Sequence, residues 1–219
     1  MNKKAKAIAR HYEDILKNYK PQHRERPIEY LYLFSHLAKM PVDSILDVGP
    51  GMTSTPKTIA ECGFDVTAID TQPYKEYWDV IEDDITDTKL SPDVVRFDLI
   101  NCISVLEHIP NWQKAVENMV SLLRPEGYLL LTFPYNEDIS HPNIYKHKLA
   151  GYGKTAKFIC KVFNREDINK IPATLIDQEY WQIFEGEMWT FGKRLIPPQK
   201  VKAEERHQLT CLLYQKGAD

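Results

Sequence analysis

A glycine-containing turn and an acidic residue could together bind a nucleoside. The turn Asp47–Gly51 reads Asp-Val-Gly-Pro-Gly and follows a short apolar run, and Asp70 ends the next apolar run. Glycines let a backbone approach a ligand closely, and the start of a following helix offers unpaired N–H groups. A carboxylate at the second position can accept hydrogen bonds from both ribose hydroxyls. The turn alone is compatible with a tight connection that binds nothing, but its combination with Asp70 predicts an adenosine site.

Two histidines are candidate catalytic residues. His108 has a side chain whose ordinary pKa of about 6.5 suits proton removal at neutral pH. His141 follows an expected strand, and open α/β sheets bind their ligands beyond the carboxyl ends of the strands. Each has an alternative: His108 could pack a loop beneath the ligand while Glu107 caps the next helix, and His141 could be a loop residue without a task.

The cysteines indicate neither a metal site nor a redox site. Cys62, Cys102, Cys160 and Cys211 lie far apart, without a C-x-x-C pair. We expect all four to be buried and reduced, because an isolated thiol behaves as a small core hydrophobe.

Composition favours an ordinary globular enzyme. Apolar residues make up 43% and charged residues 27% of the 219 residues, and the formal net charge is -3. This charge gives no overall attraction to phosphate backbones, so we expect a small-molecule partner and no nucleic acid. The basic segment 1–10 lacks the apolar stretch of a signal peptide, and no later run could span a bilayer. A cytoplasmic location is therefore predicted, and the oligomeric state is left open.

The elements that must position these residues alternate between strands and helices. Two amphipathic helices are expected first, and the later apolar runs have the lengths of strands or the spacing of helices. Expected are helices over 3–19, 27–40, 55–62 and 112–123, and strands over 44–48, 64–69, 80–81, 97–103 and 128–133. This order predicts an α/β fold with a Rossmann-like, doubly wound, mostly parallel sheet and helices on both faces. The run 97–103 is expected in its middle, because it is almost continuously apolar.

The last third of the chain is less regular. We expect a short helix over 165–171, and apolar or β-branched residues return over 174–183, 189–196 and 208–214. The last two runs are predicted as late strands that complete one edge of the sheet. Aromatic residues gather here, and they either pack these strands or line a substrate pocket. They are Tyr180, Trp181, Phe184, Trp189 and Phe191.

These elements predict one domain over 1–219. Residues 1–42 form amino-terminal helices, 43–134 form the cofactor-binding half, and 135–219 form a cap or insertion on the substrate side with the last strands.

Residues 44–134 resemble the class I S-adenosylmethionine-dependent methyltransferases at four positions in order. They are Ile45–Gly51, Asp70, Asp84–Ile85, and the run from Phe97 through Glu107-His108 to Leu129. The resemblance implies that the first turn holds the methionine half of the cofactor, that the second strand end binds ribose, and that the third motif meets adenine. The cofactor-binding residues it implies are Asp47, Gly49, Pro50, Gly51, Asp70, Thr71, Asp84, Ile85 and, through their backbone, Cys102 and Ile103.

The resemblance implies methyl transfer from S-adenosyl-L-methionine to a small molecule, with S-adenosyl-L-homocysteine as product and O-methylation favoured. The alternatives are a non-catalytic cofactor-binding protein and a methyltransferase that acts on a macromolecule. A nicotinamide-dependent oxidoreductase is disfavoured, because its turn requires G-x-G-x-x-G and this chain has Gly49-Pro50-Gly51-Met52-Thr53-Ser54.

Two positions depart from the family pattern. Thr53 stands where the first motif often has a third glycine, and Ser104 replaces the first acid of an E-x-x-E-H loop. In some relatives that loop binds a divalent metal, so the serine leads us to predict no metal site.

Overall fold

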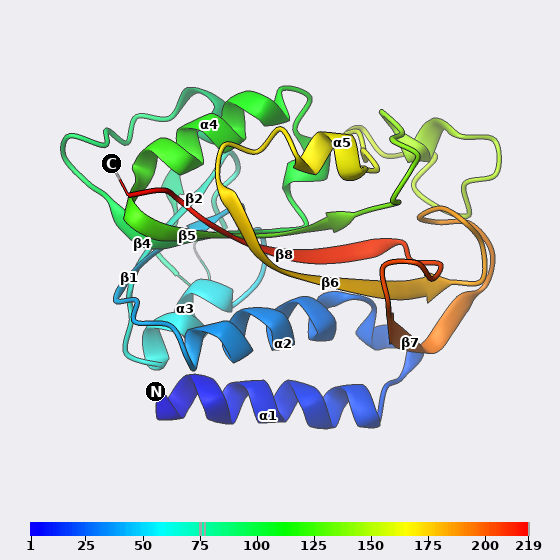
Figure 1. Cartoon of the computed structure of the whole chain (residues 1–219), viewed down its shortest axis with the longest axis horizontal. Helices are drawn as coiled ribbons and strands as arrows, with labels where there is room; N and C mark the ends of the chain where they lie inside the picture. Colours follow the sequence, from blue (N-terminus) through cyan, green and yellow to red (C-terminus); the bar gives the residue numbers. More distant parts are fainter. Residues whose placement is uncertain (75, 77, 219) are drawn as a thin grey trace.

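The computed structural model describes residues 1–74, 76 and 78–218. Within them, one eight-stranded sheet has the order β3-β2-β1-β4-β5-β8-β6-β7 (Figure 1). The strands are β1 Ser44–Val48, β2 Asp65–Asp70, β3 Ile81–Glu82, β4 Phe97–Ile103, β5 Leu123–Pro134, β6 Thr174–Phe184, β7 Arg194–Val201 and β8 Leu209–Gln215. The pairs from β3 to β5 are parallel, and the pairs from β5 to β7 are antiparallel. The mostly parallel sheet is confirmed.

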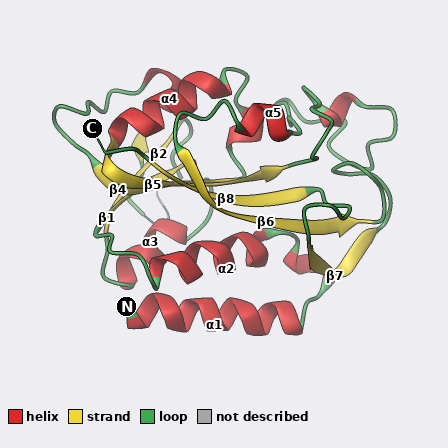
Figure 2. Ribbon diagram, viewed as in Figure 1, coloured by secondary structure: helices red, strands yellow, loops and turns green. Residues whose placement is uncertain are grey.

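Helices cover both faces of the sheet, as predicted. The longer helices α1 and α2 lie with α3 on one face, and α4 and α5 lie on the other (Figure 2). Their bounds are α1 Lys3–Lys17, α2 Arg26–Leu37, α3 Thr55–Glu61, α4 Trp112–Leu122 and α5 Arg165–Ile168. Short 3₁₀ turns are η1 Pro21–His23, η2 Ile85–Asp87, η3 Leu106–His108 and η4 Ile144–Lys146.

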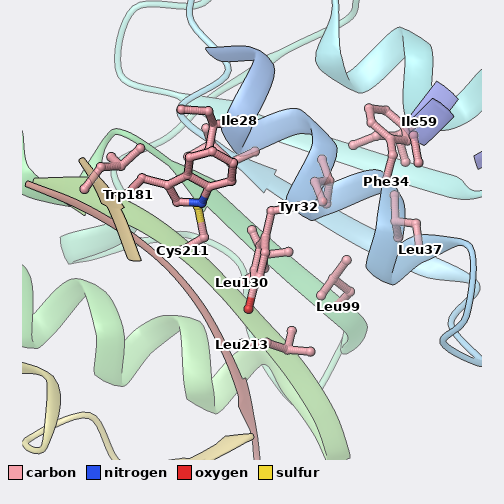
Figure 3. Close-up of a cluster of buried hydrophobic side chains, with 14 of the residues drawn as sticks. Ile28, Tyr32, Phe34, Leu37, Ile59, Leu99, Leu130, Trp181, Cys211 and Leu213 are labelled. Atoms are coloured by element: carbon pink, nitrogen blue, oxygen red, sulfur yellow. The ribbon is translucent and has the colours of Figure 1, made fainter. Parts of the chain in front are cut away.

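The core explains why α2 lies where it does. Its apolar side chains Ile28, Tyr32 and Phe34 belong to one buried cluster with Leu99 of β4 and Leu130 of β5 (Figure 3). Full burial of one such side chain stabilises a fold by about 1.5–3 kcal/mol. Helix α2 is therefore held firmly against the middle of the sheet, with its amino-terminal end near the ends of the parallel strands.

The prediction for the last strands was partly wrong. The run 189–196 is a strand only from Arg194, where β7 begins, because Thr190 and Gly192 have φ of 69° and 76°, which an extended strand does not allow. The last two strands do not complete the edge alone, because β6 is also a strand and pairs between β8 and β7. Strand β8 lies inside the sheet, next to β5.

The expected helix over 165–171 is shorter in the structure. Helix α5 has a capping box between Asn164 and Asp167, and it ends at Ile168. Ile171 precedes Pro172, and a residue before proline is disfavoured in helical geometry.

Two smaller predictions concern the cysteines and the membrane. All four cysteines are free and buried, as predicted. In the described part of the chain, no helix has the length and apolar character needed to cross a membrane.

Candidate functional site

A cavity of ≈ 760 Å³ opens at the carboxyl ends of the parallel strands. It brings together residues that follow β1, β2 and β4, and it contains five of the ten predicted cofactor-binding residues. Those five are Gly49, Asp70, Thr71, Asp84 and Ile85. The topology explains this, because parallel strands end at the same edge of the sheet, where such folds bind their ligands.

The turn after β1 requires glycine and is tied to β2. Gly49 has φ of +71°, and a Cβ there would lie 2.6 Å from Val105 Cγ2. The N–H of Gly51 donates to Asp70 Oδ2 at 3.0 Å. The hydroxyl of Thr53 donates to the carbonyl of Pro50 at 2.8 Å, so the residue that replaces the third glycine closes the turn.

Asp70 can still accept hydrogen bonds from a ligand, although both of its carboxylate oxygens have protein partners. Oδ2 accepts from Gly51, and Oδ1 accepts from the N–H of Gln72 at 2.9 Å. An ionised carboxylate has about four lone-pair positions, so two remain for hydroxyl donors. The side chain lines the cavity and is half-buried.

The adjacent acids Asp83 and Asp84 have different roles. Asp83 is buried, and both of its oxygens accept from the N–H of Lys89, at 3.1 and 3.2 Å. Asp84 is exposed in the cavity, and its Oδ1 accepts from the N–H and the hydroxyl of Thr86, both at 2.8 Å. Asp83 therefore organises the loop, and Asp84 presents its other oxygen to the cavity.

Asp47 is a buried carboxyl group with an unsatisfied oxygen. Oδ1 accepts from the Asn101 amide at 2.7 Å, and among the described residues Oδ2 has no hydrogen-bond partner. Burial raises the pKa of Asp47 to about 7. The carboxyl borders a hollow of ≈ 20 Å³ beneath the turn, which Pro50 and Ile103 also line. This is room for one water-sized polar group.

Arg26 is a cation that the sequence analysis missed. It lines the large cavity, the small hollow and a second chamber, and its guanidinium donates to Glu29 Oε2 at 2.7 Å. The sequence offered only a weak indication that Arg26 belongs to the site, because it is simply an arginine beside Pro27 at the start of an expected helix. Its position suits recognition of a carboxylate.

The second chamber has a volume of ≈ 550 Å³ and shares Arg26, Ser104 and His108 with the cavity. Its aromatic lining consists of Tyr145, Tyr152, Phe184 and Trp189. Two of the five aromatic residues singled out in the sequence, Phe184 and Trp189, thus line a pocket, whereas Trp181 packs in the core. Besides Arg26, the titratable acidic and basic side chains at the chamber include Arg24, Glu25, Glu107 and Arg194, and Arg194 pairs with Glu25 at 3.2 Å.

His108 lies where the two spaces meet. Its Nδ1 is 2.7 Å from the carbonyl oxygen of Ile159, so Nδ1 carries the proton and Nε2 is left as an acceptor. Nε2 is 3.8 Å from Glu107 Oε1. Burial lowers the pKa of His108 below its ordinary value, which favours the neutral form at neutral pH.

The structure places His141 and Cys102 away from both spaces. His141 N–H donates to the carbonyl of Val162 at 2.9 Å, and its ring lies against His147. Cys102 is fully buried within β4. Neither lines the cavity or the chamber.

A buried acid from α2 stands beside Ser104. Glu29 is fully buried, and its Oε1 accepts from the hydroxyls of Ser104 and Thr132, the latter at 2.7 Å. Arg26 supplies the positive charge of this cluster. Among residues 1–74, 76 and 78–218, no three acidic, histidine or cysteine side chains gather closely enough to hold a metal.

Residues 7–173 match the family model described as a methyltransferase domain. The chain belongs to the methyltransferase domain family. The predicted family is thus confirmed.

A curated relative of this chain is the ubiquinone biosynthesis O-methyltransferase of Photorhabdus laumondii subsp. laumondii. The two are 27% identical over 140 residues, which cover 59% of this chain and 58% of the relative. The chain thus spans little more than half the length of the curated relatives it matches.

Solved structures show the same fold. The 1,6-didemethyltoxoflavin-N1-methyltransferase of Burkholderia thailandensis, solved with its acceptor and S-adenosylhomocysteine, has a TM-score of 0.60 at 17% identity and covers 97% of this chain and 87% of its own. The [4+2]-cyclase SpnF has a TM-score of 0.57 at 10% identity and covers 89% of this chain and 82% of its own. The fold therefore occurs with more than one kind of activity.

Proposed function

We propose that this chain transfers a methyl group from S-adenosyl-L-methionine to a small molecule and releases S-adenosyl-L-homocysteine. The observation that carries the proposal is the cavity at the strand ends, which is lined by the glycine turn, Asp70 and Asp84 together. Family membership supports the reaction class.

The residues present fit the parts of this cofactor. Asp84 and the backbone of Ile85 would meet adenine, and Asp70 and Thr71 would meet ribose. The unsatisfied oxygen of Asp47 suits the contacts of an ammonium group, directly or through a water in the hollow. Arg26 supplies the positive charge that a carboxylate requires.

The expected cofactor contacts also include the turn after β1 and the end of β4. Gly49, Pro50 and Gly51 would surround the methionine half. Contacts of the Cys102 and Ile103 backbone with the cofactor's amino group stay predictions. Ser104, the next residue along the chain, lines the cavity and is therefore the more favourable candidate for this contact.

The cofactor supplies an activated methyl group, so the protein's task is to align an acceptor and exclude water. The aromatic chamber is our proposed acceptor site, because it joins the cavity at Arg26, Ser104 and His108. O-methylation of a hydroxylated small molecule is our first choice, supported by the names of the similar curated O-methyltransferases. His108 remains a candidate base because it lines both spaces, whereas His141, the other predicted candidate, lines neither.

The remaining predictions complete the proposal. Residues 1–219 act as one domain, in which 43–134 bind the cofactor and 135–219, with α2, bind the acceptor. We infer a cytoplasmic location, supported by the four free, buried cysteines.

The proposal is tested by incubating the protein with S-adenosylmethionine and a panel of phenols, catechols and amines while S-adenosylhomocysteine release is measured. Acceptor-dependent release supports it. Tight cofactor binding without release from any small acceptor supports a non-catalytic or macromolecule-directed protein instead, and binding of NAD in place of S-adenosylmethionine would reject the proposal.

A further inference from the structure

Glu107 is a buried acid whose side chain is incompletely paired. It lies on the η3 turn directly after β4, is 4% exposed and lines the aromatic chamber. Among the described residues, its Oε2 has no hydrogen-bond partner. Leaving a buried polar atom unpaired typically costs about 1–3 kcal/mol, and more for a charged group. The Glu107 side chain thus brings to the chamber a carboxyl group whose hydrogen-bonding capacity the described residues do not fully use.

Among the described residues, no lysine or arginine forms an ion pair with Glu107. Arg26 is the nearest arginine in α2, but it donates to Glu29 at 2.7 Å. Arg194 pairs with Glu25, and His108 has its proton on the nitrogen that faces Ile159. Arg24 also lines the chamber, and the charge of Arg26 favours the ionised form of Glu107, but burial outweighs this effect.

The other titratable groups around Glu107 are uncharged near neutral pH. They are Cys102 of β4, Tyr145 of η4 and Cys160, and burial raises the pKa of each. Burial, and to a lesser extent the charge of Glu29, raises the pKa of Glu107 to about 8. The group thus changes charge in the range in which an acid–base catalyst works best.

A second residue of the chamber lining also has an unsatisfied atom. The hydroxyl of Thr190 is buried and has no partner among the described residues. Together with the aromatic lining, Glu107 and Thr190 suit a planar acceptor that carries more than one hydrogen-bonding group, such as a neutral dihydroxylated or amino-substituted ring.

We propose that Glu107 is a catalytic residue: its carboxylate accepts a hydrogen bond from the reacting hydroxyl or amine of the acceptor and then receives its proton. This proposal rests on the proposed function. The acceptor's O–H or N–H bond breaks, and its proton goes to the Glu107 carboxylate. The acceptor's electron pair forms the bond to the methyl carbon as the carbon–sulfur bond breaks, with that bond's electron pair leaving on sulfur.

The test compares wild type with Glu107→Gln and with the matched control Glu117→Gln, an exposed acid on α4 that is 3.8 Å from Lys114. Calorimetry with S-adenosylhomocysteine and thermal melting first establish that each variant folds and binds. We expect Glu107→Gln to bind within about twofold of wild type and to lose roughly 100-fold in kcat with the acceptor found in the panel. The wild type and Glu117→Gln should show a kcat that rises through a pKa of about 8.

A second readout does not need turnover. Infrared difference spectra of the S-adenosylhomocysteine complex should show a protonated carboxyl band that titrates near pH 8 and is missing from Glu107→Gln. Catechol, used as the probe, should shift this band. Glu107→Asp, which keeps the acid, replaces Glu107→Gln if that variant does not fold, and it should retain a titrating band.

Wild-type kcat in a folded Glu107→Gln variant would overturn the proposal. So would a band that titrates at the ordinary glutamate pKa or that does not respond to catechol. Failure of wild type to bind S-adenosylhomocysteine would instead count against the proposed function, so the two failures can be distinguished.

Discussion

The hydroxyl of Ser104, directly after β4, donates a hydrogen bond to the buried carboxylate of Glu29 on α2. Ser104 has φ of 49°, and its N–H donates to Thr132 of β5, whose hydroxyl also reaches Glu29. The cluster joins α2 to the ends of two central strands where the cavity and the chamber meet. The amino-terminal helices are thus part of the proposed site, since α2 supplies Arg26 to both spaces.

Removal of Glu29 should destabilise the fold. Glu29→Ala leaves Arg26 without its ion-pair partner and two hydroxyls without their acceptor, and breaking a buried ion pair costs about 3–5 kcal/mol. Because Arg26 is partly exposed, we expect the lower part of this range. Urea unfolding measures it, and the surface variant Glu117→Ala should change stability by no more than about 0.5 kcal/mol. An equally small change for Glu29→Ala would show that the cluster does not hold α2.

The acids Asp83 and Asp84 should separate folding from binding. Asp84→Ala should weaken S-adenosylhomocysteine binding more than Asp84→Asn does, because asparagine keeps one acceptor oxygen. Asp83→Ala should mainly lower the melting temperature, because its oxygens accept from the Lys89 N–H. Calorimetry and thermal melting on the same samples measure both effects. If Asp83→Ala weakened binding and Asp84→Ala lowered only the melting temperature, the adenine contact would be assigned to Asp83 instead.

Stability should depend on pH through Glu107. Its pKa in the folded protein is about 8, above the ordinary glutamate value that applies in the unfolded chain. The folded state therefore binds the proton more tightly, so its favourable contribution is complete below the unfolded pKa and is lost as pH rises to about 8. The free energy of unfolding of Glu107→Gln, relative to wild type, should increase over this interval and then become constant. Denaturant titrations of both proteins at several pH values up to and beyond 8 measure this difference in the free energy of unfolding. A difference that does not depend on pH would contradict the raised pKa of Glu107.

The histidine candidates make separate predictions for the pH dependence of kcat. Replacing a true base by glutamine should remove the limb on which kcat rises and lower kcat by roughly 100-fold. Burial lowers the pKa of His108, so a limb due to it would lie below the ordinary histidine value. With Glu107 as base, His108→Gln and His141→Gln should both retain a limb near pH 8. A limb below the ordinary histidine pKa that disappears in one of these variants would instead assign the proton to that histidine.

Local patterns were sufficient to predict the parallel half of the fold. The turn before Gly51, the strand that ends at Asp70 and the apolar run of β4 are each readable within a few residues. Their meeting at one edge follows from parallel topology, which is why Asp70 and Asp84 could be predicted together.

The parts that were missed depend on contacts between distant segments. Glu29 meets Thr132 across 103 positions of sequence, and a glutamate in an amphipathic helix looks like a solvated residue until its partners are known. The environment of Glu107 depends in the same way on α2. The start of β7 was misplaced because apolar residues around Trp189 pack in a loop with positive φ at Thr190, which composition does not reveal.

The most direct test of the cofactor site is a calorimetric titration of S-adenosylhomocysteine into wild type and Asp70→Ala, with melting curves to establish that both are folded. The account predicts one saturable site per wild-type chain. Each charge-assisted hydrogen bond to ribose contributes about 1.5–3 kcal/mol, and about 1.4 kcal/mol is a tenfold change, so the variant should bind at least roughly tenfold more weakly. A wild type that gives no saturable heat, or a folded Asp70→Ala variant that binds within about twofold of wild type, would contradict it.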